Sequence, residues 1–379
     1  MQLAWNMTQN RNLKNPRKTA NVKLYCTSTM SSLKRKGLVC RTKILIVFMF
    51  LFSFWYQLFS TNVLENVATI EIPDVETLDL DGFIPLGIDA VEDNLSQNLP
   101  PKIPRIIHQT WRDRAVPSNV VAWMKSWSIY HPMWRYVYWT DETARCLIKD
   151  RHTNLLHIYD AYLENIRRAD TMRYIILFEF GGVYADMDLE SLRSLDVIIG
   201  KYSCILAQEP YEHPIMDGNF KHLVINAFIA CAKKHPFMKL VVDRLTYFNH
   251  FWNVLDSTGP HFLTFAYNTY RAQQSVNRTD VDDVYLAPAE YFFPTIDPEK
   301  FSYMMELCKQ FHNLNELRQQ ACVSLKTLGL QRGPYIFSFT IHHWIHTYFR
   351  NGFSFAEKHD IFEVIPGAKM YDCIEGIRI

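Results

Sequence analysis

An apolar run from Ile44 to Phe59, interrupted only by Ser53 and Gln57, divides the 379-residue chain. With its flanks it covers about 17 residues, roughly 25 Å as a helix, which is just enough to cross a thin bilayer. Ten Lys and Arg and no acidic residue precede it, whereas residues 65–93 contain nine acidic residues and no basic one. Positive flanks stay in the cytosol. We therefore expect a signal anchor, with a cleaved signal peptide and a buried core helix as the alternatives.

This topology predicts four parts along the chain. They are a basic cytosolic tail over 1–43, a transmembrane anchor over 44–60, a lumenal stem over 61–101 and a folded domain over 102–379. The stem is acidic and lacks clear periodicity, as linkers do. A hydrophobic content of 48% is ample for one large core in the folded part. We expect a single-pass type II protein of the Golgi or ER membrane, and topology explains the basic tail better than binding to nucleic acid.

Six of the eight cysteines follow the anchor and would lie in an oxidising compartment. No Cys-x-x-Cys spacing is present, so the cysteines do not indicate a zinc site. Cys308 and Cys322 bracket a polar helical segment and are the disulfide we expect, while the other pairings stay open. Asn94 and Asn277 begin lumenal sequons and are the expected glycosylation sites.

Apolar runs alternate with amphipathic segments through the folded part. Strands are predicted at 105–109, 135–139, 183–187 and 203–207, and helices at 118–130 and from about 155 to 180. This alternation predicts an α/β fold with a largely parallel sheet. Ligands bind at the carboxyl ends of such strands, so Trp111, Asp141 and the aspartates after residue 185 would share one edge. Three tryptophans are expected in the core: Trp127, Trp134 and Trp252.

Asp186 and Asp188 form one of three Asp-x-Asp pairs, and their surroundings set them apart. The pairs at 79–81 and 280–282 lie in polar sequence and are best explained as solvated surface. The middle pair ends an apolar strand, where a buried charge is costly unless it is compensated. On a strand, residues i and i+2 share a face about 6 to 7 Å apart. Two such carboxylates suit Mn²⁺ or Mg²⁺, whose open positions would take phosphate oxygens. An ion pair at the strand end or a helix cap is the alternative.

The helix before this strand carries two further candidates, Asp170 and Arg173. They lie at i and i+3, so they can pair on one face of the helix. Gly181-Gly182 would end the helix with a left-handed turn and bring both residues near Asp186. An exposed salt bridge on the helix surface is the alternative for this pair.

Together these segments resemble glycosyltransferase family 32. The resemblance is carried by Ala169-Asp170-x-x-Arg173-Tyr174 and Gly181-Gly182-Val183-Tyr184-x-Asp186-x-Asp188. Further segments follow in the family's order, at 103–111, 138–141, 226–228, 235–237, 258–260 and 292–294. The family includes α-1,6-mannosyltransferases, inositol-phosphoceramide mannosyltransferases and α-1,4-galactosyl- and N-acetylglucosaminyltransferases. The resemblance implies a GT-A fold, Rossmann-like, a nucleotide-sugar donor, a Mn²⁺-type ion and retention of anomeric configuration.

The resemblance also implies roles for individual residues. Asp170, Arg173, Asp186 and Asp188 would form the catalytic set, in which Asp170 and Arg173 hold the donor sugar and phosphate. The expected donor-side residues further include His108, Gln109, Thr110, Trp111 and Tyr184. A His-x-Trp pattern favours His342 over His343 as a third metal ligand, and His346 is expected to be structural. Asn226, Gly259 and Pro260 are the candidates for the acceptor cleft. Front-side retaining transfer needs no general base, so Glu209 is assigned no catalytic role.

The predicted function is transfer of a hexose, foremost mannose from GDP-mannose, to a glycan or glycolipid acceptor. An α-1,4-transferase that uses UDP-galactose or UDP-N-acetylglucosamine is the alternative donor choice. A phosphohydrolase would need more clustered acidic or His ligands than the sequence offers. A lumenal carbohydrate-binding protein without catalysis is the alternative of another class.

Overall fold

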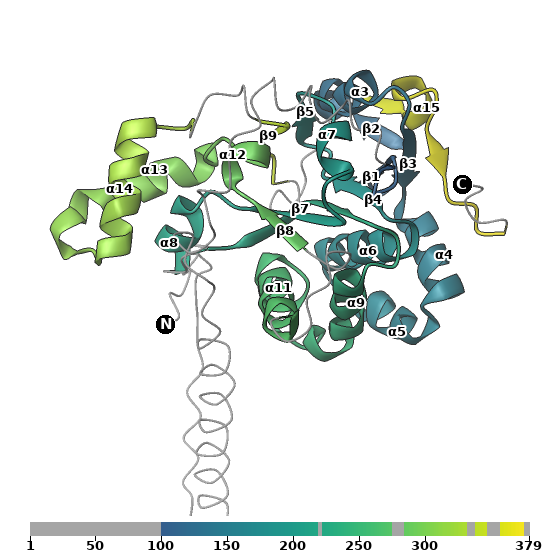
Figure 1. Ribbon diagram of the computed structural model, residues 1–379, viewed down its shortest axis with the longest axis horizontal. Coiled ribbons are helices and arrows are strands. Elements are labelled where there is room, and N and C mark those ends of the chain that lie inside the picture. The colour runs from purple at the N-terminus through teal and green to yellow at the C-terminus, as the bar shows by residue number, and fades with distance from the viewer. Residues whose placement is uncertain (1–99, 219–221, 275–283, 332–337, 347–356, 375–379) are drawn as a thin grey trace, which may run out of the picture. The chain divides into compact units, whose positions relative to one another are not determined.

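The computed structural model describes residues 100–218, 222–274, 284–331, 338–346 and 357–374 (Figure 1). All of these belong to one unit of the chain, Thr69–Ile379. The predicted tail and anchor, nearly all of the stem, and the sequons at Asn94 and Asn277 lie outside the described residues. Within the described ranges, no helix is long and apolar enough to cross a membrane.

A seven-stranded mixed sheet is the centre of the fold, in the order β11-β3-β1-β4-β7-β6-β8 (Figure 1). Neighbouring strands in it are parallel except where β7 pairs with β4 and β6. The carboxyl ends of the other strands therefore meet at one edge, so the predicted α/β fold with a largely parallel sheet is confirmed. The strands are β1 Ile106–Thr110, β3 Arg135–Trp139, β4 Gly182–Ala185, β6 Cys204–Gln208, β7 Val224–Cys231, β8 Val284–Ala287 and β11 Lys369–Met370.

Helices cover both faces of this sheet. Side chains alternate along a strand, so Ile107 and Val183 enter one core while Ile106 and Tyr184 enter the other. The first core is closed by η2 Ser118–Val120, α3 Val121–Tyr130, α7 Asp196–Ile199, α12 Ala289–Phe292 and α15 Ile361–Val364. The second is closed by α4 Asp141–Arg151, α5 Thr153–Ala161, α6 Asn165–Phe180, α9 Pro236–Phe248 and α11 Pro260–Gln274, with α10 Val254–Ser257 beside α11.

Two short antiparallel pairs complete the strands. One joins β2 Ala115–Pro117 to β10 Lys358–Asp360, and the other joins β5 Leu189–Ser191 to β9 Thr340–His342. The second pair matters for the site, because it sets His342 opposite Leu189, the residue that follows Asp188.

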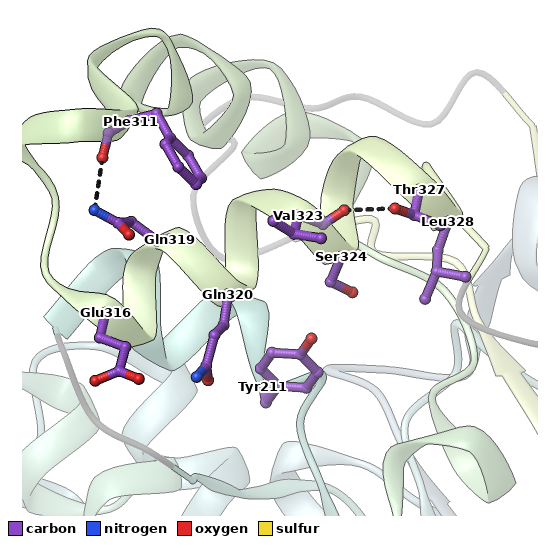
Figure 2. A pocket seen from close by; sticks show the side chains of 9 residues that line it. All are labelled: Tyr211, Phe311, Glu316, Gln319, Gln320, Val323, Ser324, Thr327 and Leu328. Carbon is purple, nitrogen blue, oxygen red and sulfur yellow. Dashed lines mark hydrogen bonds between the residues drawn. The ribbon is translucent and has the colours of Figure 1, made fainter.

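A separate small core lies among four helical segments: α8 Glu212–Gly218, α13 Pro298–Leu307, η3 Cys308–Asn313 and α14 Glu316–Leu328. A disulfide joins Cys308 to Cys322 here, with the Cα atoms 5.5 Å apart. A hollow of about 580 Å³ opens between Tyr211, Phe311 and one side of α14 (Figure 2), and no predicted site residue lines it. Two further disulfides join Cys146 to Cys373 and Cys204 to Cys231.

Several expectations about helices, strands and burial need correction. Helix α4 is not among the predicted helices; it begins at Asp141, after a reciprocal cap between Thr140 and Thr143. The single helix predicted over about 155–180 is two helices, because the chain is extended at Tyr162 between α5 and α6. Trp127 and Trp134 are buried as expected, but Trp252 is 96% exposed. The strand predicted over 183–187 ends at Ala185.

Candidate active site

The turn between α6 and β4 requires its two glycines. Gly181 and Gly182 have φ of 65° and 100°, a region that side chains disfavour. A Cβ on Gly181 would lie 2.5 Å from the Lys233 nitrogen, and one on Gly182 would lie 2.6 Å from the Ile106 oxygen. The predicted left-handed turn is confirmed. It leads the chain from the end of α6 directly into the central strand β4.

Asp186 and Asp188 lie in a turn after β4 rather than on the strand. The Leu189 amide donates to the Asp186 carbonyl at 3.0 Å, which closes the turn. The prediction that strand alternation aligns the two carboxylates is therefore wrong in its geometry. The turn is fixed from outside, because the Asp186 amide donates to the Ala227 carbonyl and the Ile345 amide donates to Oδ2 of Asp188 at 3.0 Å.

The two aspartates and His342 form a group with ligand atoms within 4.8 Å of one another. Nε2 of His342 is 3.3 Å from Oδ1 of Asp188. The imidazole packs edge-on against Trp344, and its Nδ1 is buried without a hydrogen-bond partner among the described residues. Carboxylate oxygens and an imidazole nitrogen are a ligand set that suits Mn²⁺. These residues fit a divalent cation in chemistry and spacing.

Asp170, Arg173 and Asp186 form a second group, which we call the inner cluster. The guanidinium of Arg173 lies 3.1 Å from Oδ1 of Asp170 and 3.1 Å from Oδ1 of Asp186. Asp170 also accepts from Nδ2 of Asn226 at 2.9 Å and from Oγ1 of Thr258 at 3.0 Å. Asp170 and Arg173 are each only 2% exposed, which excludes the alternative of an exposed salt bridge on the helix.

Burial and neighbouring charges shift the acids of the site in different directions. Burial raises the pKa of Asp170 to about 6, although Arg173 opposes the shift. Burial also raises the pKa of Asp186, again against Arg173. Burial acts on Asp188 too, but His342 and the Ile345 amide outweigh it and hold the pKa of Asp188 well below its usual range. Burial would lower the pKa of His342, but Asp188 raises it overall.

Negative charge is therefore in excess at this edge of the sheet. Asp170 is buried and Asp186 and Asp188 are half-buried, and among the described residues Arg173 is the one Lys or Arg in a salt bridge with any of the three carboxylates. Arg173 and the Tyr184 hydroxyl both bind Oδ1 of Asp186. Oδ2 of Asp186 is thus the oxygen left for a ligand. A divalent cation is the simplest species that would neutralise this excess.

The predicted nucleotide-side residues divide into two groups. His108 and Gln109 belong to β1, in agreement with the strand predicted over 105–109, and both are fully buried. His108 binds the Gly181 carbonyl at 2.9 Å and accepts from Nε1 of Trp139 at 3.1 Å, and burial lowers its pKa to about 4. Gln109 donates to the Asp186 carbonyl at 3.1 Å. His108 therefore braces the glycine turn before β4, and Gln109 braces the aspartate turn after it. Thr110 and Trp111 are only partly buried, at the carboxyl end of β1.

The other candidates take varied places. Tyr184 is 1% exposed, and its ring lies under Arg173 with 4.6 Å between centroid and guanidinium carbon. Asn226 belongs to the inner cluster through Asp170. Gly259 and Pro260 follow Thr258 at the start of α11. Three residues named for comparison bind elsewhere: His343 binds Glu190, His346 binds Asp297, and Glu209 binds His213.

Sequence reasoning missed two contributors to the site. Thr258 bonds to Asp170, and it stood in the Thr258-Gly259-Pro260 segment, so a signal was present. The Ile345 amide bonds to Asp188, and a backbone amide leaves no signal in sequence.

Residues 117–205 match a family model described as a glycosyltransferase sugar-binding region containing a DXD motif. Inositol phosphoceramide mannosyltransferase 3 of Schizosaccharomyces pombe is 36% identical over 48% of this chain and 50% of its own length. Mannosyl phosphorylinositol ceramide synthase SUR1 of Saccharomyces cerevisiae is 30% identical over 52% and 50%. The predicted resemblance to this family is confirmed. The chain spans about half the length of these curated relatives.

The initiation-specific α-1,6-mannosyltransferase of Saccharomyces cerevisiae is 31% identical over 25% of this chain and 21% of its own length. Among solved structures, the PaToxG glycosyltransferase matches at 12% identity, with 62% of this chain and 88% of that chain covered. Its TM-score of 0.35 is too low to support an argument about fold.

Proposed function

We propose that this chain, which carries the DXD-containing sugar-binding region of glycosyltransferases over residues 117–205, is a metal-dependent, retaining hexosyltransferase of GT-A fold. The observation that carries the proposal is the group Asp186, Asp188 and His342. The group lies at the carboxyl edge of the sheet, and its ligand atoms are within 4.8 Å of one another. The carboxylates at this edge carry more negative charge than Arg173 neutralises.

Asp186, Asp188 and His342 would hold Mn²⁺ or Mg²⁺. The bound ion would supply the positive charge that stabilises a leaving nucleoside diphosphate. Asp170 and Arg173 are proposed to hold the donor sugar and phosphate, and Arg173 also fixes Oδ1 of Asp186. Because Arg173 is held on two sides by carboxylates, the geometry of Asp186 is set before a ligand arrives.

The donor and acceptor follow from the relatives. Their names describe mannosyltransferases, so GDP-mannose is the first donor we propose, with UDP-galactose and UDP-N-acetylglucosamine as the alternatives. Two of the relatives are named for inositol phosphoceramide, which supports a glycolipid acceptor ahead of a protein-linked glycan. Thr110 and Trp111 would face the nucleotide, and Gly259 and Pro260 would face the acceptor.

We further propose a lumenal catalytic domain, held at the Golgi or ER membrane by the apolar run at 44–60. Three disulfides in the described part support an oxidising compartment, because such bonds are rare in the cytosol. Glycans at Asn94 and Asn277 would be a direct sign of lumenal exposure.

Binding of metal and donor is the first test, with the purified full chain. Thermal unfolding would be followed with Mn²⁺ and each of GDP-mannose, UDP-galactose and UDP-N-acetylglucosamine, and donor hydrolysis would be measured in parallel. We expect one donor to raise the melting temperature only when Mn²⁺ is present. A lumenal carbohydrate-binding protein would give no metal-dependent shift with any donor, and that result would overturn the proposal.

The Asp188→Asn variant tests the metal assignment. It keeps the shape of the side chain but removes the charge, so we expect transfer to fall roughly 1000-fold. Stability should fall as well, because the fold favours the ionised form of Asp188, so circular dichroism at the assay temperature is used to check that the variant is folded. Glu190→Gln is the matched control, since Glu190 lies two residues on and binds His343 instead. Transfer that survives Asp188→Asn would show that the metal site lies elsewhere.

A further inference from the structure

Leu163 and Trp252 are large apolar side chains that the fold leaves in solvent. Trp252 is 96% exposed and Leu163 is 92% exposed. Leu163 lies between α5 and α6, and Trp252 lies between α9 and α10. An exposed tryptophan that makes no core is unusual, and aromatic residues of this kind favour surfaces that are apolar on one side and wet on the other.

A single buried arginine ties the two loops together. Arg167 is 5% exposed, and its guanidinium donates to the Glu164 side chain at 2.9 Å, to the Phe251 carbonyl at 3.0 Å and to the Trp252 carbonyl. Arg167 therefore holds the loop of Trp252 through two backbone carbonyls and the loop of Leu163 through the neighbouring Glu164 side chain. Because the two loops are fixed in advance, less conformational entropy would be lost when Leu163 and Trp252 bind a surface.

The two carboxylates next to these loops, those of Glu164 and Asp256, each have a hydrogen-bond partner. Glu164 is bound by Arg167, and Asp256 lies 2.7 Å from Nδ1 of His261. Leu255, in the same segment as Trp252, is 37% exposed. Because both carboxylates are also partly exposed, insertion of the apolar side chains only to the headgroup level would leave these charges in contact with water.

The Trp252 loop is also continuous with the active site. Ser257 accepts from Arg167, and the next residue, Thr258, donates to Oδ2 of Asp170 at 3.0 Å. Binding at Trp252 would therefore also restrain the segment that leads through α10 to Thr258, which binds Asp170.

We propose that Leu163 and Trp252 form a membrane-interface surface, which seats the catalytic domain on the bilayer that holds its lipid acceptor. Trp is enriched at the headgroup level of membranes, where its ring is apolar and its N–H stays hydrated. The chain outside the described residues supports this occupant. An apolar run at 44–59 precedes a connection of about 40 residues, which can extend to roughly 130 Å, so the domain reaches its own membrane at high effective concentration. The inference rests on the proposed anchor, but its first test does not depend on transfer.

Quenching by brominated lipid is that first test. The full chain is reconstituted in phosphatidylcholine nanodiscs, with and without lipid brominated near the headgroup, and is compared with Trp252→Phe. We expect bromolipid to quench more of the wild-type fluorescence than of the variant, because Trp252 then lies within the interface. Equal fractional quenching in both would place Trp252 in water and overturn the proposal.

A second test separates the surface from the chemistry. Initial rates are measured with inositol phosphoceramide in the nanodisc and, separately, for hydrolysis of the donor. We expect Trp252→Ala and Leu163→Ala to lower transfer to the lipid by about tenfold each, as loss of interfacial burial predicts, with donor hydrolysis unchanged. Met133→Ala is the control, since Met133 is 87% exposed after α3.

Two outcomes of these measurements count against the surface. Equal losses of transfer and donor hydrolysis would assign Trp252 to the catalytic fold rather than to the membrane. A change in oligomeric state on Trp252→Ala, seen by sedimentation in detergent, would show that a second copy of the chain covers the surface. Absence of transfer by the wild type would bear on the proposed function alone, because the quenching result stands without it.

Discussion

Helix α6 holds a buried carboxylate near each end, and the two have opposite surroundings. Asp170 is 2% exposed and shares one guanidinium, that of Arg173, with Asp186. Glu179 is 4% exposed and binds Arg151, His152 and Lys234. Burial raises the pKa of Asp170 to about 6, whereas for Glu179 hydrogen bonds to these three partners outweigh burial and lower its pKa to about 2.

The number of cations for each carboxylate explains the difference. Around Glu179 positive charge meets or exceeds negative charge, so the ionised form is stabilised without help. Around Asp170 negative charge exceeds positive charge, so ionisation costs free energy until a cation or ligand arrives. We call the end of α6 that holds Glu179 the closed end and the end that holds Asp170 the open end. The closed end stabilises the fold and the open end is suited to binding, since functional sites commonly cost a protein stability.

The largest effect is expected when the shared cation is removed from the open end. Arg173→Met leaves Asp170 and Asp186 without the cation that they share, so the free energy of unfolding should fall by about 3 to 5 kcal/mol. Transfer should be lost in the same variant. Urea denaturation with the disulfides intact measures the first effect, and a donor assay measures the second.

Arg151→Met is the matched control at the closed end. The Arg151 side chain is 36% exposed and Glu179 keeps His152 and Lys234, so we expect a loss of no more than about 1 kcal/mol. Similar losses of unfolding free energy in Arg173→Met and Arg151→Met would show that the two ends of α6 do not differ in their electrostatic surroundings.

Loss of the acid itself at the closed end should have the next largest effect. Glu179→Gln removes a carboxylate whose ionised form the fold favours, so stability at pH 7 should fall by about 2 to 3 kcal/mol. Transfer at 25 °C should stay near the wild-type rate, because Glu179 is not part of the site. A variant that is stable but inactive would contradict the division between the two ends.

Sequence could predict the open end because its parts are local. Asp170, Arg173 and the aspartates lie on one helix, one glycine turn and one strand end, so spacing alone brings them together. The closed end escaped notice because Arg151 and Lys234 come from other elements and follow no motif. The reversed direction of β7 was equally invisible, since alternation of apolar residues does not report strand direction.

Helix α4 and the third metal ligand do leave a signal in the sequence. Thr140-Asp141-Glu142 follows the strand predicted over 135–139, and a Thr followed by two acids is how a helix begins, which is where α4 starts. The third ligand could be chosen between His342 and His343 only through the family pattern. In the structure β9 pairs with β5 and brings the imidazole of His342, not that of His343, to the Asp188 carboxylate.

A smaller effect, of opposite sign, is expected for the acid of the open end. Asp170→Asn keeps the shape and most hydrogen bonds of the side chain but removes a charge that the fold disfavours. Stability at pH 7 should rise by about 1 kcal/mol, while transfer falls because Arg173 is then free to pair with Asp186 alone. Chemical denaturation and the donor assay give the two values. A clear loss of stability would mean that the ion pair with Arg173 outweighs the cost of burial.

The pH dependence of these stability differences also separates the two ends of α6. Asp170 has a folded pKa of about 6, above its unfolded value of about 4, so the folded state takes up the proton first. Wild-type stability relative to Asp170→Asn should therefore rise as pH falls from 6 to 4, by about 1 to 2 kcal/mol. Glu179 has a folded pKa of about 2, below its unfolded value, so its contribution is complete above about pH 4.5 and is lost as pH falls towards 2.

The stability gap between wild type and Glu179→Gln should accordingly stay constant from pH 7 to 5 and close only in stronger acid. Urea denaturation of the three proteins from pH 7.5 to 3.5 tests both curves in one series. Curves that bend in the same window and in the same direction would mean that the two ends of α6 share one electrostatic environment. Opposite slopes in separate windows would locate the unneutralised charge at Asp170, on the side of the helix where Arg173 meets Asp186.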